Sequence, residues 1–287
     1  MKKLIILLFI KIMLIVLMNN SYSQWQPDIR LTNSSGNSST TENNVWSVAV
    51  YGDTIHVIWY DDRDGNTEIY YKRSTDGGIS WGSDIRMTNN SANSTNSAIS
   101  VSGSTVHVVW QDDRDGNFEI YYKRSIDAGV TWGTDTRLTT ESSTSERPCI
   151  ASIGSFVDIV WTDNRNYNPE IYNKRSTDGG VSWDTDLRLT INTGNKYYPC
   201  VAISDSVLHV VWQDDRNGTA NTYYKRSTNR GLNWGSDIRL ANDSYASGIP
   251  CISALGSTVI AIWEQDYYGK PERYQETKAR KEDELLD

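Results

Sequence analysis

Short loops rich in aspartate and arginine are the residues of this chain whose types and spacing could do chemistry. The segment Asp-Asp-Arg-Asp-Gly-Asn occurs at 61–66 and 112–117, with variants at 163–168 and 214–219. Carboxylates, guanidinium groups and amides can hydrogen-bond the hydroxyl groups of a ligand. We therefore predict ligand-binding residues in these loops and in the divergent segment 265–270. They are Asp62, Arg63, Asp64, Asp113, Arg114, Asp115, Asp163, Arg165, Asp215, Arg216, Asp266 and Tyr267.

The same loops permit two other interpretations. Asp62, Asp64, Asn66 and Glu68 alternate along a glycine-containing loop, which loosely resembles oxygen-rich calcium loops. The full EF-hand pattern is missing, so no cofactor is predicted and calcium stays an alternative. The remaining interpretation is that Asp–Arg pairs and Asp–Gly turns only shape a solvated hairpin.

An internal repeat of 51 residues sets the positions of these loops. Two tryptophan series keep this interval, as does a Lys-Arg-Ser triplet that begins at Lys72. The first series is Trp59, Trp110, Trp161, Trp212 and Trp263, and the second is Trp81, Trp132, Trp183 and Trp234. A spacing held without insertion requires a structural unit with fixed loop lengths.

Each unit reads as four short strands separated by polar turns. Examples are 97–101, 105–110, 68–73 and 81–88, and no segment shows a helical period. A repeated unit of four strands and about 40–50 residues is typical of a propeller blade. The sequence therefore predicts an all-β, five-bladed β-propeller of four-stranded blades over residues 24–274.

The two ends of the repeat suggest how the propeller closes. Unit five passes into a charged tail, 275–287, without a fourth strand, while a matching strand stands alone at 25–32. We predict that this N-terminal strand completes the last blade and leaves no open edge. A truncated larger propeller is the alternative.

The N-terminus is typical of an exported protein. Lys2 and Lys3 precede an apolar run, 4–18, and Ser21 and Ser23 offer small residues for cleavage. We predict a signal peptide over 1–23 and a secreted or cell-surface protein, with an uncleaved membrane anchor as the alternative. No second apolar stretch could span a membrane. The net charge of −8 argues against a nucleic-acid partner.

The turns before the second tryptophan series carry a family resemblance. They read Ser-x-Asp-x-Gly-x-Ser/Thr-Trp at 74–81, 125–132 and 176–183, and in degraded form at 227–234. This pattern resembles the Asp box, or BNR repeat, of the sialidase-like propellers. Its structural residues are Asp76, Trp81, Asp127, Trp132, Asp178, Trp183, Asn229 and Trp234. The aspartates can accept backbone N–H groups, and a glycine such as Gly78 permits a positive φ; we expect a looser turn in unit four.

The resemblance also implies where a ligand would bind. In sialidases these boxes lie on the face away from the active site, so the Asp–Arg loops are expected on the opposite face. Retaining sialidases use three arginines, a tyrosine nucleophile paired with glutamate, an aspartate acid/base and an Arg-Ile-Pro motif on six blades. This chain has five units and no Arg-Ile-Pro, and 13 of its 17 arginines occupy repeated slots.

Repeated arginines are first explained as scaffold, since one substrate needs residues that differ from blade to blade. We therefore predict no catalytic residue and a non-catalytic module that binds a glycan or a surface protein. An exo-α-sialidase-like glycoside hydrolase is the alternative, and the oligomeric state stays open.

Histidines and cysteines follow the repeat as well. His56, His107 and His209 share a slot that Asp158 and Ile260 fill elsewhere, which indicates packing and no metal site. Cys149, Cys200 and Cys251 share a slot for small buried residues, and we expect them to lie too far apart for a disulfide.

Overall fold

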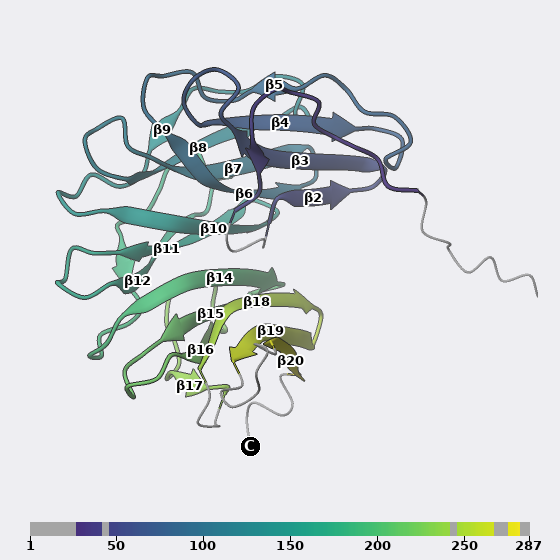
Figure 1. Cartoon of the computed structure of the whole chain (residues 1–287). Helices are drawn as coiled ribbons and strands as arrows, with labels where there is room; N and C mark the ends of the chain where they lie inside the picture. Colours follow the sequence, from purple (N-terminus) through teal and green to yellow (C-terminus); the bar gives the residue numbers. More distant parts are fainter. Residues whose placement is uncertain (1–26, 42–45, 242–245, 267–274, 282–287) are drawn as a thin grey trace, which may run out of the picture. The chain divides into compact units, whose positions relative to one another are not determined.

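The computed structural model describes residues 27–41, 46–241, 246–266 and 275–281, in two compact units, Met1–Asn33 and Ser34–Asp287. In the first unit the described residues, 27–33, carry no strand, and Arg30 Nε donates to the carbonyl of Thr32 at 2.7 Å. The predicted signal peptide lies outside the described residues. All the strands belong to the second unit (Figure 1). Nothing in the described part is a helix long and apolar enough for a membrane span.

The second sheet shows the plan of the repeat. Its strands are β6 (Ser94–Ser102), β7 (Thr105–Asp112), β8 (Glu119–Ser125) and β9 (Thr136–Arg137), antiparallel and in that order. The third sheet has β10 (Ser145–Ile153), β11 (Phe156–Asp163), β12 (Glu170–Ser176) and β13 (Leu187–Arg188), and the fourth has β14 (Lys196–Ser204), β15 (Val207–Asp214), β16 (Asn221–Ser227) and β17 (Ile238–Arg239). The β-branched residues of the second strand in each unit explain this strand structure.

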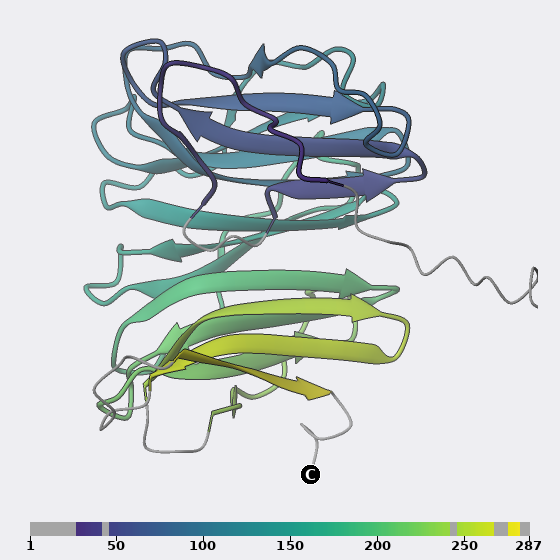
Figure 2. The same cartoon turned by 45° about the vertical axis from the view of Figure 1, so that its right-hand side comes forward.

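Successive sheets pack face to face, with their first strands side by side (Figures 1 and 2). The apolar core lies between sheets: one cluster joins Val109 and Ile120 of the second sheet to Ile159 and Trp161 of the third. Trp110, Trp161 and Trp212 are fully buried on the second strand of their sheets. Three such sheets, together with a first and a fifth sheet that vary the plan, confirm the prediction of an all-β propeller.

The first sheet differs from this plan at its inner edge. Its strands are β1 (Ser38–Ser39), β2 (Val48–Tyr51), β3 (Thr54–Asp61), β4 (Glu68–Ser74) and β5 (Ile85–Arg86), and both β1 and β2 pair with β3. Ser38 Oγ donates to Asp61 at 2.6 Å, as Ser94 Oγ does to Asp112 at 2.7 Å. The start of β1 therefore corresponds to the start of β6. In the first sheet a separate segment lies between β1 and β2, whereas β6 is one continuous strand.

The fifth sheet corrects one boundary. Its strands are β18 (Ser247–Leu255), β19 (Thr258–Asp266) and β20 (Gln275–Lys281), and β20 pairs with β19 from Asp266↔Gln275 onward. Residues 275–281, expected in the charged tail, are thus part of the propeller, because the edge of β19 needs a partner for its backbone groups. The structure does not show closure by residues 25–32, so closure stays a prediction.

Candidate functional site

The first four sheets each have two chemically different ends. At one end, here called the box end, the Ser-x-Asp turns lie beside the turns between first and second strands, and Gly77 N donates to the carbonyl of Asp53 at 2.9 Å. At the other end, the loop end, the Asp–Arg loops meet the connections between sheets, and Asn66 Nδ2 donates to the carbonyl of Asn90 at 3.1 Å. The loops and the boxes therefore lie at opposite ends, as expected.

The turns at the box end are held by their aspartates. Asp127 accepts hydrogen bonds from Ser125 Oγ at 2.7 Å, Thr131 N at 2.8 Å and Thr131 Oγ1 at 2.6 Å. These bonds stabilise the ionised carboxylate and lower the pKa of Asp127. Asn229 accepts from Ser227 Oγ at 3.0 Å and from Asn233 N at 2.8 Å. The turn of unit four thus keeps these two hydrogen bonds but lacks the charged acceptor, and a looser turn stays a prediction.

At the loop end, the repeated arginines are committed to their own sheets. Arg114 donates to both oxygens of Asp112 at 2.8 and 2.6 Å and to Asp135 at 2.9 Å, and its guanidinium lies 4.3 Å from the ring centre of Tyr121. The same arrangement holds Arg63, Arg165 and Arg216. These arginines therefore connect each loop to its own sheet, and their role in ligand binding stays a prediction.

The predicted aspartates are also engaged. Asp113 accepts from Asn93 N at 2.7 Å and Asn93 Nδ2 at 3.3 Å, and Asp62 and Asp215 accept from Asn37 and Asn195 in the same way. Asp64 and Asp115 accept the hydroxyls of Tyr70 and Tyr121 and pair with Arg86 at 3.1 Å and Arg137 at 3.2 Å. The residues predicted to bind a ligand therefore hold the loops together.

Asp163 requires a correction. It is fully buried and accepts from Trp161 Nε1 at 2.8 Å and Ser145 Oγ at 2.9 Å, because it stands at the end of β11 in the slot of Asp112. Asn164 follows it in the slot of Asp113. Asp163 is therefore no surface ligand contact. Asp266 ends β19, and Tyr267 lies outside the described residues.

The structure does not bring the residues of the calcium alternative together around one point. Asp62 faces Asn37, Asp64 faces Tyr70, and Glu68 faces Arg86 at 2.9 Å. Their oxygens are thus directed to different protein partners. No group of carboxylates, histidines or thiols suited to a metal ion occurs among the described residues.

The first strands of four sheets carry a bulge near the loop end, where the repeat breaks. The pairing shifts at Thr95/Ala98, Glu146/Cys149, Tyr197/Cys200 and Gly248/Cys251. Within the bulges Asn96, Arg147, Tyr198 and Ile249 have positive φ of 49°, 54°, 54° and 48°. Bulges re-aim side chains and are frequent beside functional sites. The side chain in this slot differs in each of these four sheets.

The bulge residues of the second, third and fourth sheets form one cluster. The Arg147 guanidinium lies 5.0 Å from the ring centre of Tyr198 and 6.0 Å from that of Tyr197, and it pairs with Glu146 at 2.7 Å. Gln111 Oε1 accepts from Arg147 N at 2.9 Å and from Asn96 Nδ2 at 3.1 Å. We call Asn96, Gln111, Glu146, Arg147, Tyr197 and Tyr198 the Tyr-Arg cluster.

The electrostatics of this cluster follow from its partial burial. Burial, and then the negative charge of Glu146, raise the pKa of Tyr197. Both tyrosines are half-buried, so each keeps part of its ring exposed. The cluster thus combines aromatic rings with a guanidinium, a carboxylate and amides.

None of the residues predicted to bind a ligand belongs to the Tyr-Arg cluster. The predicted residues lie in the repeated loops and in the divergent segment 265–270. The available signal was the slot of Asn96, Arg147, Tyr198 and Ile249: these residues are 51 positions apart and share no chemistry.

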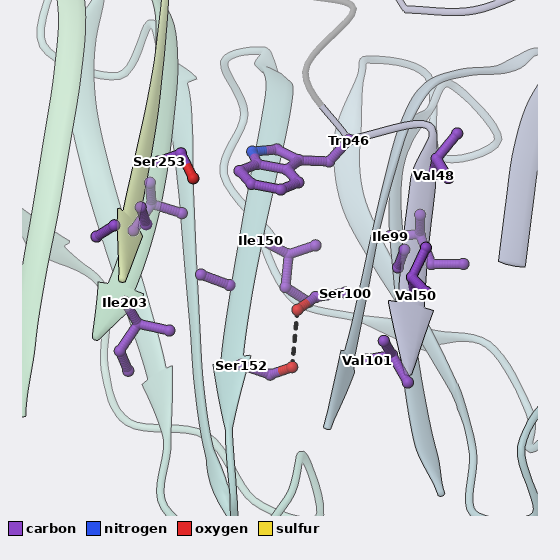
Figure 3. Close-up of a pocket in the computed structure, with 15 residues that line it drawn as sticks. Trp46, Val48, Val50, Ile99, Ser100, Val101, Ile150, Ser152, Ile203 and Ser253 are labelled. Atoms are coloured by element: carbon purple, nitrogen blue, oxygen red, sulfur yellow. Dashed lines mark hydrogen bonds between the residues drawn. The ribbon is translucent and has the colours of Figure 1, made fainter. Parts of the chain in front are cut away.

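A pocket of about 380 Å³ lies between the inner strands (Figure 3). Ile99, Ile150 and Ile203 line it, and Ser100 Oγ and Ser152 Oγ are hydrogen-bonded at 2.7 Å. The ring of Trp46 lies among these strands in Figure 3 and packs against two core clusters. The lining is largely apolar, so this pocket has few groups that could orient a polar ligand.

Histidines and cysteines are structural. His107 Nδ1 lies 2.7 Å from the hydroxyl of Tyr122, and burial, helped by Arg124, lowers the pKa of His107 to about 4. The thiols of Cys149, Cys200 and Cys251 are free, with no disulfide between them. Inner strands lie side by side, so Ile252 N reaches Cys200 Sγ at 3.3 Å, and burial together with the neighbouring Cys149 thiol raises the pKa of Cys200.

Solved structures with a similar fold are glycoside hydrolases. The α-L-arabinofuranosidase Arb93A of Fusarium graminearum, in complex with an iminosugar inhibitor, is 13% identical with a TM-score of 0.56, and the match covers 88% of this chain and 99% of that one. The Trypanosoma rangeli sialidase, in complex with 2,3-difluorosialic acid, is 12% identical with a TM-score of 0.51, covering 88% of this chain and 58% of that one. The NanB sialidase of Streptococcus pneumoniae is 14% identical with a TM-score of 0.53, covering 77% and 36%.

No protein-family model and no curated protein sequence matches the chain. At these low identities the structural likeness establishes the fold alone, a β-propeller similar to those of these sialidases and this arabinofuranosidase.

Proposed function

We propose that this chain is an exported, non-catalytic propeller that binds a carbohydrate through its Tyr-Arg cluster. The observation that carries the proposal is the bulge slot, where side chains differ between sheets that otherwise repeat. A propeller that binds one ligand near its centre needs such differences. The cluster lies at the loop end, away from the box turns that resemble the Asp boxes of sialidases.

The chemistry of the cluster suits a sugar. Tyr197 and Tyr198 are half-buried rings whose centres lie 6.3 Å apart, which provides apolar faces for the C–H groups of a pyranose or furanose. Asn96, Gln111 and Glu146 supply amide and carboxylate groups for hydroxyls. Because Arg147 is already paired with Glu146, a neutral sugar is a better fit than an acidic one. The fold neighbours support this class, since an arabinofuranosidase with a TM-score of 0.55 is solved with arabinobiose.

The absence of catalysis is proposed from the arginines. A sialidase-like carboxylate clamp needs three arginines that converge, and the slots of Arg63, Arg73 and Arg86 are engaged within the scaffold. Arg63 pairs with Asp61 at 2.7 Å, Arg73 donates to the carbonyl of Ala128 at 2.7 Å, and Arg86 pairs with Glu68 at 2.9 Å. The Tyr-Arg cluster, by contrast, contains one arginine, Arg147.

A glycan array followed by titration of the best ligand tests the proposal. We expect Tyr198→Ala to weaken binding by about tenfold or more, equivalent to about 1.4 kcal/mol, because an aromatic face is lost. The matched control is Tyr167→Ala, which removes a fully exposed tyrosine, also at the loop end. Equal affinity of wild type and Tyr198→Ala would overturn the assignment of the site. If the ligand is a surface protein, the array stays blank while Tyr198→Ala still abolishes binding to cells.

A sialidase-like hydrolase is the second candidate, favoured by one electrostatic interaction. Tyr197 and Glu146 are electrostatically coupled beside Arg147, and tyrosine paired with glutamate is the nucleophile arrangement that the sialidase resemblance implies. A fluorogenic sialoside distinguishes the two functions. Turnover that disappears in Tyr197→Phe would replace the binding proposal with catalysis.

Export belongs to the same proposal and has its own test. N-terminal sequencing of the protein recovered outside the cell is expected to begin at Gln24. Protein retained in the membrane with an intact N-terminus would favour the anchor.

A further inference from the structure

A His–Tyr side-chain pair occurs in the first, second and fourth sheets and is absent from the third. Nδ1 of His56, His107 and His209 lies 2.6, 2.7 and 2.8 Å from the hydroxyls of Tyr71, Tyr122 and Tyr224, respectively. In the third sheet the two slots hold Asp158 and Asn173, and Asn173 Nδ2 donates to Asp158 Oδ1 at 3.3 Å. The third sheet thus lacks both the imidazole and the phenol.

The tyrosine of this pair fills the space under the next box turn. At Gly180 an added Cβ would lie only 2.0 Å from the Tyr122 hydroxyl. The ring of Tyr122 also meets Trp183 edge-on, with ring centres 4.9 Å apart. Tyr71 makes the same two contacts with Gly129 and Trp132, at 2.0 and 4.9 Å. A phenol group is therefore the normal occupant of this space.

Between the third and fourth sheets the same space is open. A Cβ at Gly231 would meet Leu208 Cδ1 at 3.2 Å and Asp158 Oδ1 at 3.5 Å, and no phenol lies there. Within the described part of the chain, no ring packs edge-on against Trp234. A pocket of about 490 Å³ lies here, lined by Asn173, Arg175, Trp183, Asp184, Thr185, Leu187, Gly231 and Leu232.

We propose that this pocket, the sheet-three pocket, binds a phenol: an aromatic ring bearing one hydroxyl group that takes the place of the missing tyrosine. The volume is sufficient, because an apolar cavity of about 150 Å³ already holds a benzene ring. Trp183, Leu187 and Leu232 supply apolar lining. The inference is independent of the proposed carbohydrate function, since the pocket lies at the box end.

Two polar groups define where the hydroxyl would go. Asn173 Nδ2 donates inward to Asp158 Oδ1 and to the carbonyl of Ile159 at 3.2 Å, so the amide oxygen of Asn173 is the acceptor left for a ligand. Behind it Asp158 is wholly buried, and its Oδ2 has no hydrogen-bond partner among the described residues. Burial raises the pKa of Asp158 to about 7, against the opposing effects of Asn173 and Arg175. A buried carboxyl group with an open oxygen is unusual without a ligand or water nearby.

Titration of the mature chain with p-cresol, followed by ligand-observed NMR and calorimetry, tests the proposal. We expect one site in the wild type and about tenfold weaker binding of toluene, which lacks the hydroxyl and its hydrogen bond. Asn173→Tyr should abolish binding while folding normally, because three other sheets carry tyrosine in that slot and Gly231 is already in place. N-acetyltyrosinamide distinguishes a tyrosine side chain of a peptide from a free phenol as the source of the ring.

The reciprocal variant is the matched control. Tyr122→Asn empties the equivalent space beside Gly180 and should create a second p-cresol site. Tyr198→Ala, at the other end of the sheets, should leave p-cresol binding unchanged. Undiminished binding to Asn173→Tyr, equal affinity for toluene, or no binding of p-cresol to the wild type would each overturn the proposal.

Discussion

At the scale of single residues, buried carboxylates are the main determinants of the repeat. Asp112 accepts from Trp110 Nε1 at 3.0 Å, from Ser94 Oγ at 2.7 Å and from Arg114 through two nitrogens. A buried charge is tolerated when it is paired and fully hydrogen-bonded. The Asp-Asp-Arg loops recur because this network recurs, which explains why they looked like binding sites in the sequence.

Asp158 is the exception, and it predicts a pH effect. Because its pKa is raised to about 7 in the folded chain, the folded state binds a proton that the unfolded state loses near pH 4. The contribution of Asp158 to the free energy of unfolding therefore falls as pH rises from about 4 to about 7. Urea denaturation should show that Asp158→Asn gains stability relative to wild type across this window. A constant difference between the two proteins would contradict the assignment.

The buried histidines act in the opposite direction. His56 and His107 have pKa values lowered to about 4, so the folded state resists protonation that the unfolded state accepts near pH 6.5. Their contribution is lost as pH falls from about 6.5 to about 4. His107→Gln should reduce this acid sensitivity, measured as a flatter dependence of urea midpoint on pH. An unchanged slope would show that the histidine is not the group responsible.

At the scale of elements, the box turns join neighbouring sheets. Arg124 Nη1 donates to the carbonyl of Gly179 at 2.6 Å, and Lys123 Nζ donates to the carbonyl of Met87 at 2.6 Å. The third strands of the second and third sheets therefore contact the sheet before and the sheet after their own. These contacts explain why loop lengths are held constant through the repeat.

Two glycines allow a matched test of the contact under the box turn. Gly180 and Gly231 have nearly equal φ of 79° and 77°, so an alanine costs about 1–2 kcal/mol of backbone strain at either site. Gly180→Ala should cost about 1–3 kcal/mol more, because its Cβ would meet the Tyr122 hydroxyl at 2.0 Å. Urea denaturation measures both variants. Equal destabilisation would mean that the tyrosine yields without loss.

The degraded turn of unit four offers a repair. Asn229→Asp combined with Asn233→Ser restores the acceptor and the hydroxyl donor that Asp178 and Ser182 provide at 2.6 Å. Thermal melting should show a higher midpoint for this double variant. The control is Asp178→Asn with Ser182→Asn, which should lower the midpoint; no change in either direction would show that the turn chemistry is neutral.

The strands can be predicted from the sequence but the Tyr-Arg cluster cannot, and the reason is physical. The spacing of Trp59 and its equivalents reports a geometry repeated in every sheet, so the fold could be predicted from it. The Tyr-Arg cluster depends on bulges that turn Arg147 and Tyr198 toward each other, and a bulge is visible only in the pairing register. Asp158 and Asn173 stand 15 positions apart, and only the strand register brings them together.

At the scale of the molecule, closure by residues 25–32 stays a prediction that can be tested. Replacing 25–32 with a glycine-serine segment of equal length should lower the melting midpoint and make the fifth sheet the first to exchange its amide hydrogens. The comparison is the same replacement of 282–287. Identical exchange in the fifth sheet of both variants would show that the leading segment closes nothing.

The polar links from Arg73, Arg124 and Arg175 to the following box turn all span 55 positions, at 2.7, 2.6 and 2.8 Å. These three interfaces therefore share the same hydrogen bond from arginine to a backbone carbonyl. This bond does not distinguish one pair of sheets from another. A duplicated 51-residue unit would therefore bring the hydrogen-bonding groups that it needs to contact the sheets on both sides. The number of blades can then change by gain or loss of one unit. The third sheet has Asp158 and Asn173 where its neighbours have a His–Tyr pair, so it would define a fixed direction around such an array.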